Sequence, residues 1–207
     1  MMRECARTGL CGVGVVAVLM AATMAACGSR GASYPDGDKV QAAQKAWCGM
    51  LAEILSPEGE ADGWDDRSSC EGTYPTASAA FIAGMTDCFK TMVSREGGGD
   101  MNPRQMVADC TEQVLVDLGG EVRGLGITQA RCERTARCQD DVTVEECIDA
   151  FENLPLSERS RLSTMYNWGA QEEIASCLNG GCSDDEDEAM VACYEDAHSE
   201  RIWLPDE

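Results

Sequence analysis

Hydrophobic residues recur along most of the chain at intervals of three and four, which places them on one face of an α-helix. The first such stripe begins near Asp38 and ends before Pro57 and Gly59. Its members are Val40, Ala43, Trp47, Met50, Leu51 and Ile54. The pattern predicts an amphipathic helix over this stretch. The polar residues 57–76, which include Trp64 and Cys70, are expected to form a loop.

Two further stripes predict a helical hairpin. The first helix covers residues 77–95, and its apolar face consists of Phe81, Met85, Cys88, Phe89 and Met92. The second begins at Pro103, with Asn102 placed to cap it, and ends at the stop signal Gly119-Gly120. Its stripe consists of Met106, Cys110, Val114 and Leu118. A glycine-rich break centred on Gly99 separates the two helices.

A second group of helices follows residue 125. Thr128 is expected to cap a helix ending at Cys138, and Thr143 with Glu146 has the spacing of a capping box. Ser157 is expected to cap a longer helix that runs to Leu178 with a bend at 167–169. A second capping-box pattern, Ser183 to Glu186, opens a last helix with Met190, Cys193, Tyr194 and Ala197 on one face. No strand-like alternation of useful length occurs. The predicted fold class is all-α, with about six or seven helices forming disulfide-tied antiparallel hairpins.

The amino-terminal apolar segment has a different character. Residues 13–26, "VGVVAVLMAATMAA", contain no charge and are fewer than the roughly 20 that a membrane-spanning helix needs. Arg3 and Arg7 precede them, and small residues follow. A basic start, a short apolar middle and a small-residue exit are typical of a secretory signal peptide. A retained membrane helix is less favoured because the segment is short and the next residues are polar.

The end of this segment is Met24-Ala25-Ala26, followed by Cys27. It resembles the lipobox of bacterial lipoproteins. The resemblance implies a diacylglycerol thioether on Cys27, cleavage just before it, and fatty acylation (for example by palmitate) of the new amine. Since no Asp follows Cys27, it also implies an outer-membrane address in a Gram-negative bacterium. The alternative is an ordinary secretory peptide cut near Ala26, which would leave Cys27 as a spare thiol.

The chain then divides into a signal peptide at 1–26, a lipidated tether at 27–38, and helical regions at 39–125 and 126–207. The two helical regions are read either as separate or as one continuous domain. The body resembles, in style only, uncharacterised Cys-rich helical lipoproteins of predatory and soil bacteria such as myxobacteria.

Cysteine parity supports this interpretation. Of 13 cysteines, Cys5 and Cys11 would leave with the signal, and Cys27 would carry lipid. The ten that remain are Cys48, Cys70, Cys88, Cys110, Cys132, Cys138, Cys147, Cys177, Cys182 and Cys193. In an exported protein an even set indicates a disulfide framework. Metal binding is the alternative, but the chain has no Cys-x-x-Cys pair and only one histidine, so no metal or cofactor is expected.

Symmetry about turns suggests some of the disulfide pairs. Cys88 and Cys110 are equally far from Gly99, so they should lie opposite each other in an antiparallel hairpin. Cys132 and Cys147 flank the next turn almost symmetrically, with Cys138–Cys147 as the competing pair. The other pairings stay open. Three of those cysteines, Cys177, Cys182 and Cys193, are expected to tie the last hairpin, with one of them reaching elsewhere.

Charge restricts the class of partner. The net charge of −21 would become −22 once Arg3, Arg7 and Glu4 leave with the signal. Such a chain repels phosphate backbones and anionic lipid head groups, so nucleic-acid binding is excluded and the lipid would have to hold the protein on its membrane.

Candidate catalytic residues are few. The single histidine, His198, lies in a charged segment and is interpreted as a solvated side chain. Asp65 and Asp66, beside Trp64, are the best carboxylate pair for acid–base chemistry on a glycan. The acidic run at 183–188 offers oxygens for calcium but lacks the ligand spacing of an EF-hand. The sequence therefore predicts a non-catalytic, lipid-anchored cell-envelope protein that is structural or binds an envelope protein or glycan. The alternatives are an envelope polysaccharide hydrolase and, less favoured, a divalent-cation buffer.

Overall fold

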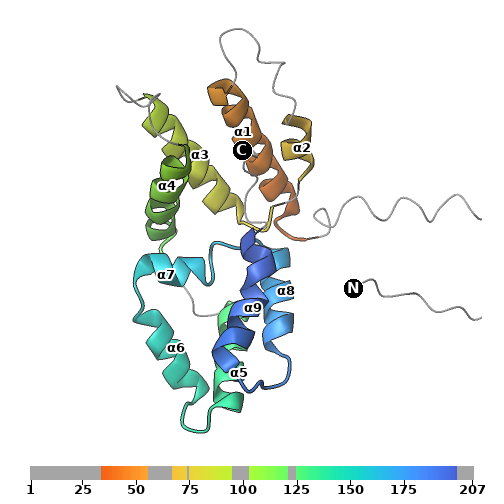
Figure 1. Ribbon diagram of the computed structural model, residues 1–207, viewed down its shortest axis with the longest axis vertical. Coiled ribbons are helices and arrows are strands. Elements are labelled where there is room, and N and C mark those ends of the chain that lie inside the picture. Colours follow the sequence, from red (N-terminus) through yellow and green to blue (C-terminus); the bar gives the residue numbers. More distant parts are fainter. Residues whose placement is uncertain (1–33, 56–66, 74, 95–102, 121–124, 200–207) are drawn as a thin grey trace, which may run out of the picture. The chain divides into compact units, whose positions relative to one another are not determined.

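The computed structural model describes residues 34–55, 67–73, 75–94, 103–120 and 125–199. All of them belong to one compact unit of the chain, residues 31–207. Within the described ranges the secondary structure is nine helices and one isolated β-bridge, which confirms the all-α prediction. The helices are α1 (Gly37–Leu55), α2 (Arg67–Gly72), α3 (Ala79–Ser94), α4 (Pro103–Asp117), α5 (Gly126–Cys138), α6 (Val144–Glu152), α7 (Leu156–Arg161), α8 (Trp168–Leu178) and α9 (Glu186–Ser199) (Figure 1).

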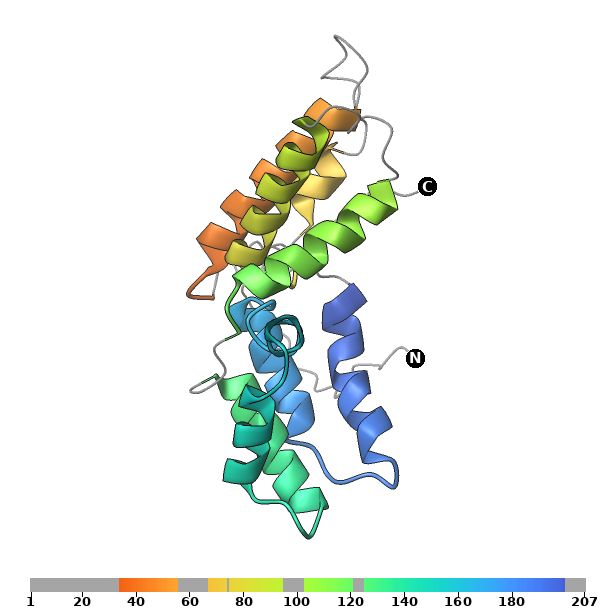
Figure 2. The ribbon, with the colours of Figure 1, turned by 90° about the vertical axis from the view of Figure 1, so that its left-hand side faces the viewer.

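The first three predicted stripes lie on α1, α3 and α4, and their residues form the core between these helices. In α1 the residues Val40, Trp47, Met50 and Leu51 are buried, and in α3 the residues Phe81, Met85 and Phe89 are buried. The two helices meet through the rings of Trp47 and Phe89, which stack edge to face with centroids 5.0 Å apart. α4 packs against the other side of α3 (Figure 2). Gly119 and Gly120 end this segment with φ of 78° and 53°, as the stop signal predicted.

Two of the nine helices, α2 and α7, account for the excess over the predicted six or seven. α2 lies in the segment that the sequence assigned to a loop. It is only six residues long, so no helical period can be recognised in it. Its position is fixed by the disulfide between Cys48 and Cys70 and by buried Gln44, whose Nε2 donates to the Cys70 carbonyl at 3.0 Å. Tertiary contacts, rather than local propensity, therefore hold this helix.

The predicted long helix from Ser157 to Leu178 is wrong. The structure has α7 and α8 instead, separated by residues 162–167. Asn167 causes the break, because its side chain accepts from the amide of Ala170 and so caps a new helix. Ser157 is not a cap, since it lies inside α7, which begins after Pro155. A proline at that position has no amide hydrogen to leave unpaired.

Asn167 also joins two distant parts of the chain. Its side-chain amide donates to the carbonyl of Pro75 at 2.6 Å, and its backbone amide donates to Thr76. Ala77 forms the isolated bridge with Tyr166 beside these bonds. Buried hydrophobic residues from both parts of the chain, from Val40 in α1 to Ala197 in α9, form a single hydrophobic core cluster. The boundary near residues 125 and 126 stays a prediction.

Some of the helix caps predicted in the carboxyl-terminal part of the chain are present in the structure, and others are not. The capping box at Thr143 and Glu146 is confirmed in both directions. Thr128 is not a cap, because α5 already begins at Gly126 and Thr128 is buried inside it. At α9 the Glu186 carboxylate accepts from the Ser183 amide, but the Ser183 hydroxyl accepts from Asp185 instead of Glu186. Asn102, the cap proposed for α4, lies outside the described residues.

Five disulfides use all ten cysteines that follow Cys27. They are Cys48–Cys70, Cys88–Cys110, Cys132–Cys147, Cys138–Cys182 and Cys177–Cys193, with Cα–Cα distances from 5.4 to 5.9 Å. The pairs Cys88–Cys110 and Cys132–Cys147, inferred from symmetry about their turns, are confirmed. The competing Cys138–Cys147 pair is not formed, because Cys138 pairs with Cys182 in the turn between α8 and α9.

Candidate functional site

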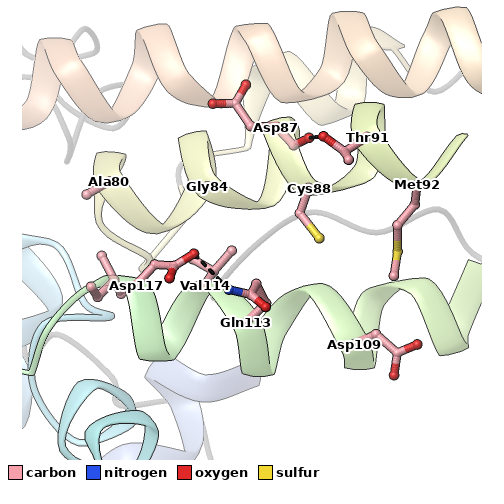
Figure 3. Close-up of a pocket in the computed structure, with 11 residues that line it drawn as sticks. Ala80, Gly84, Asp87, Cys88, Thr91, Met92, Asp109, Gln113, Val114 and Asp117 are labelled. Atoms are coloured by element: carbon pink, nitrogen blue, oxygen red, sulfur yellow. Dashed lines mark hydrogen bonds between the residues drawn. The ribbon is translucent and has the colours of Figure 1, made fainter. Parts of the chain in front are cut away.

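A groove with a volume of about 660 Å³ lies between α3 and α4. Figure 3 shows the two helices antiparallel, with Cys88 and Met92 pointing from α3 toward α4. The groove is lined by Ala80, Gly84, Asp87, Cys88, Thr91, Met92, Asp109, Gln113, Val114, Asp117 and Leu118. We call this surface the α3–α4 groove. Its volume lies within the range of small-ligand and peptide pockets.

At the floor of the groove Gly84 of α3 lies against Val114 of α4. A Cβ on Gly84 would lie 2.8 Å from a Val114 methyl carbon, so only glycine allows this approach without a shift. Further along, the Cys88–Cys110 disulfide ties the helices together, and the sulfur of Met92 lies 3.5 Å from that of Cys110. The floor is therefore apolar and covalently held.

The walls of the groove carry three carboxylates, Asp87, Asp109 and Asp117. Gln105 donates to Asp109 at 2.7 Å, and Gln113 donates to Asp117 at 3.1 Å, which positions both carboxylates along α4. None of the lining residues is a lysine, arginine or histidine. An apolar floor between negative walls favours a ligand that is cationic and amphipathic.

A second cluster has the composition of a metal site but a structural explanation. The sulfurs of Cys138 and Cys182 and a Glu186 carboxylate oxygen lie within 4.8 Å of one another. The two sulfurs are bonded to each other, so neither is a thiolate ligand. The carboxylate accepts from Arg134 Nε at 2.7 Å, and hydrogen bonds from Arg134 and then from the Ser183 amide hold the pKa of Glu186 below its ordinary value. This carboxylate serves as the start of α9 and as the partner of a buried arginine.

Most single residues proposed from the sequence lie outside the described residues. These are Cys27, Trp64, Asp65 and Asp66, together with the side chain of His198. In the acidic run at 183–188, Asp185 accepts from the Glu188 amide and Glu186 from Arg134, so two of its carboxylates act in helix capping and ion pairing. The ten cysteines are placed, and all of them are structural.

Sequence reasoning missed the α3–α4 groove as a site. One signal was present, because Asp109, Gln113 and Asp117 follow one another at intervals of four and must share a helix face. That spacing indicates a polar ridge but not a hollow beside it. The hollow depends on how α3 and α4 are spaced.

Comparisons of the chain with protein-family models, with curated proteins and with solved structures found no match. None of the described helices combines the length and the apolar character needed to cross a membrane. The chemical character of the α3–α4 groove is therefore the observation from which a function is argued. Its carboxylates, amide and apolar floor are suited to holding a ligand without covalent chemistry.

Proposed function

We propose that the protein is an exported, non-catalytic, lipid-anchored protein of the cell envelope, which binds a cationic amphipathic partner in the α3–α4 groove. Partner binding is argued from the apolar and acidic lining of the α3–α4 groove, and export is argued from the pairing of all ten cysteines after Cys27 into five disulfides. Disulfides of this density are typical of proteins that fold in an oxidising compartment. Their closure leaves Cys27 outside the framework, together with Cys5 and Cys11 of the proposed signal peptide.

Cys27 is the proposed point of lipid attachment. It follows the lipobox-like Met24-Ala25-Ala26, and the residues after it are polar. A chain with a net charge of −21 gains nothing from the negative surface of a membrane. Two or more acyl chains on one residue suffice for stable anchoring, because each buried methylene contributes about 0.8 kcal/mol.

The anchor is tested by intact-mass measurement of the full chain expressed in a Gram-negative host. We expect a chain that begins at Cys27, carries the mass of a diacylglycerol with or without a third acyl chain on the amine, and has no free thiol. Cys27→Ser should abolish the lipid mass and move the protein from the membrane to the soluble fraction. Cys11→Ser is the matched control, because that cysteine is removed with the signal and the mature mass should not change.

An uncleaved chain with reduced cysteines would contradict both export and anchoring. A chain cut near Ala26, with an unmodified thiol on Cys27, would keep export and refute the lipid.

The groove is tested with a fluorescently labelled amphipathic helical peptide that has one lysine-rich face and one leucine-rich face. The protein is used as the full processed chain in neutral micelles. Replacing Asp87, Asp109 and Asp117 with asparagine should weaken binding about tenfold and reduce its dependence on salt, since charges beside an apolar contact act on encounter and specificity. The measurement is a fluorescence-anisotropy titration at two salt concentrations.

The matched control removes three exposed carboxylates elsewhere, with Asp140→Asn, Asp141→Asn and Glu172→Gln. This variant has the same net charge as the groove variant. Equal weakening by both variants would mean that the peptide responds only to overall charge, and the groove would be rejected as the binding surface.

A further inference from the structure

A second hollow lies between α5, α9 and the turn that follows α7, with a volume of about 340 Å³. Its walls are mainly apolar and aromatic: Leu162, Tyr166, Met190, Val191 and Tyr194. Three charged residues complete the lining, namely Arg131, Arg161 and Asp187. We call it the Arg131 hollow. Mostly apolar walls with a few charged groups are typical of small-molecule sites.

Arg131 differs from the other arginines near it. Arg134 pairs with Glu186 at 2.7 Å, and Arg161 pairs with Glu112 at 3.0 Å. Among the described residues no carboxylate lies within ion-pair distance of Arg131. Its guanidinium carbon lies 5.6 Å from the Phe151 ring centroid and 6.0 Å from that of Tyr194. Two aromatic faces therefore hold a partly buried cation whose hydrogen-bond donors are not used by an acidic side chain.

Tyr194 does not supply the missing negative charge. The residue is 8% exposed, and its hydroxyl lies near the Arg131 guanidinium without forming a hydrogen bond of good geometry. Burial raises the pKa of Tyr194, and nearby Arg131 offsets only part of that rise. The phenol is thus neutral at physiological pH, and its ring serves as a wall beneath the cation.

The charges around the hollow favour a ligand that carries one negative charge. Asp187 is the single acidic lining residue, against two arginines, and it is exposed at the start of α9. Because Arg161 is already paired with Glu112, Arg131 is the cation left for a ligand. A cationic ligand would be repelled by this guanidinium, with only the exposed carboxylate of Asp187 to offset the repulsion.

We infer that the Arg131 hollow binds a small organic monocarboxylate, whose carboxylate pairs with the Arg131 guanidinium and whose apolar body packs against Leu162, Met190 and Val191. A planar guanidinium matches the two oxygens of a carboxylate. The inference goes beyond the proposed function, because it concerns an anionic small molecule at a different surface. It does not depend on the lipid or on the α3–α4 groove.

The experiment is a fluorine NMR titration of the full processed chain in neutral micelles, with empty micelles as the blank. The probe is para-fluorophenylacetate, and the comparison compound is its neutral analogue para-fluorophenylacetamide. We expect saturable binding of the acid and binding of the amide weaker by about tenfold or more, the ratio that corresponds to loss of one charge-assisted hydrogen bond.

Two sets of variants locate the binding. Arg131→Gln should weaken binding of the acid about tenfold, whereas Arg67→Gln, which removes a similar charge at exposed α2, should leave it unchanged. Val191 is 59% exposed and lines the hollow, so it can be changed without unfolding the chain. Val191→Glu should weaken binding of the acid more than Val191→Gln. The two new side chains are similar in size, but only glutamate places a negative charge near the carboxylate of the ligand.

The inference is overturned if the acid does not bind saturably, or if acid and amide bind equally. It is also overturned if Arg131→Gln melts like the parent and keeps its affinity. Should Arg131→Gln fail to fold, the Val191 pair decides: equal affinity of those two variants would refute the site.

Discussion

At the scale of single residues, Glu186 performs two tasks with one carboxylate. It accepts from the Ser183 amide, which closes the first turn of α9, and from Arg134, which is 3% exposed. Arg134 in turn donates to the Gly181 carbonyl at 3.0 Å, and Arg137 donates to the Gly180 carbonyl at 2.7 Å. The two arginines thereby satisfy carbonyls that follow the end of α8.

The lowered pKa of Glu186 makes this cluster sensitive to pH. Because its folded-state pKa lies below the ordinary value, its contribution to stability is present above the unfolded-state pKa and is lost as pH falls through the folded-state pKa. Glu186→Gln should therefore lower the melting temperature at neutral pH, and the difference from the parent should shrink as the pH is lowered through the acid range. Thermal melts followed by circular dichroism measure it.

Glu188→Gln is the control for this prediction, because it removes the same charge from the first turn of α9, and the Glu188 side chain forms no ion pair with any described residue. The prediction is contradicted if Glu186→Gln lowers the melting temperature by the same amount as Glu188→Gln, or by an amount that does not change with pH. Either result would show that the pairing with Arg134 contributes nothing specific to stability.

At the scale of elements, the spacing of α3 and α4 depends on Gly84. Alanine favours a helix over glycine by about 1 kcal/mol, but a Cβ here meets the stiff, β-branched Val114 at 2.8 Å. Overpacking of a core contact costs about 1–3 kcal/mol. Gly84→Ala should therefore destabilise the protein by about 1 kcal/mol in urea denaturation, and it should become stabilising in a Val114→Ala background.

Gly49→Ala in α1 is the matched control. Its Cβ would meet no atom within 4 Å, so the substitution should stabilise the protein by about 1 kcal/mol. If Gly84→Ala also stabilises the parent, the contact between Gly84 and Val114 does not determine the spacing of α3 and α4.

The elements that could be predicted from the sequence are those that bury a continuous face. α1, α3 and α4 are long enough for their stripes to repeat, and α4 is followed by two glycines with positive φ. α2 and α7 span six residues each, so their existence depends on partners far along the chain. Thr128 failed as a cap because a threonine before a helical stripe can equally face the core. Cysteine pairs symmetric about a turn were predictable, whereas both hollows depend on distances between helices that spacing does not encode.

At the scale of the whole molecule, disulfides supplement a core that is poor in aromatic residues. The Cys138–Cys182 bridge closes the longest loop, 44 residues, and its two cysteines are not fully buried. Replacing both with serine should cost about 4 kcal/mol on the chain-entropy estimate. Replacing Cys177 and Cys193, which are 16 residues apart, should cost about 1 kcal/mol less.

Urea denaturation of the oxidised proteins measures both costs. The reverse order would show that local packing around Cys193, which is 9% exposed, outweighs restriction of the unfolded chain.

The order of the five bridges along the chain has a consequence for biosynthesis. Cys48–Cys70 and Cys88–Cys110 are separate, consecutive loops, so each can close as soon as its second cysteine emerges. The last three overlap, and Cys147 emerges before Cys182 does. If the chain oxidises as it emerges, as the proposed export implies, Cys138 can join Cys147 before Cys182 is available. We therefore expect the segment from Cys132 onward to depend most on a catalyst that rearranges disulfides.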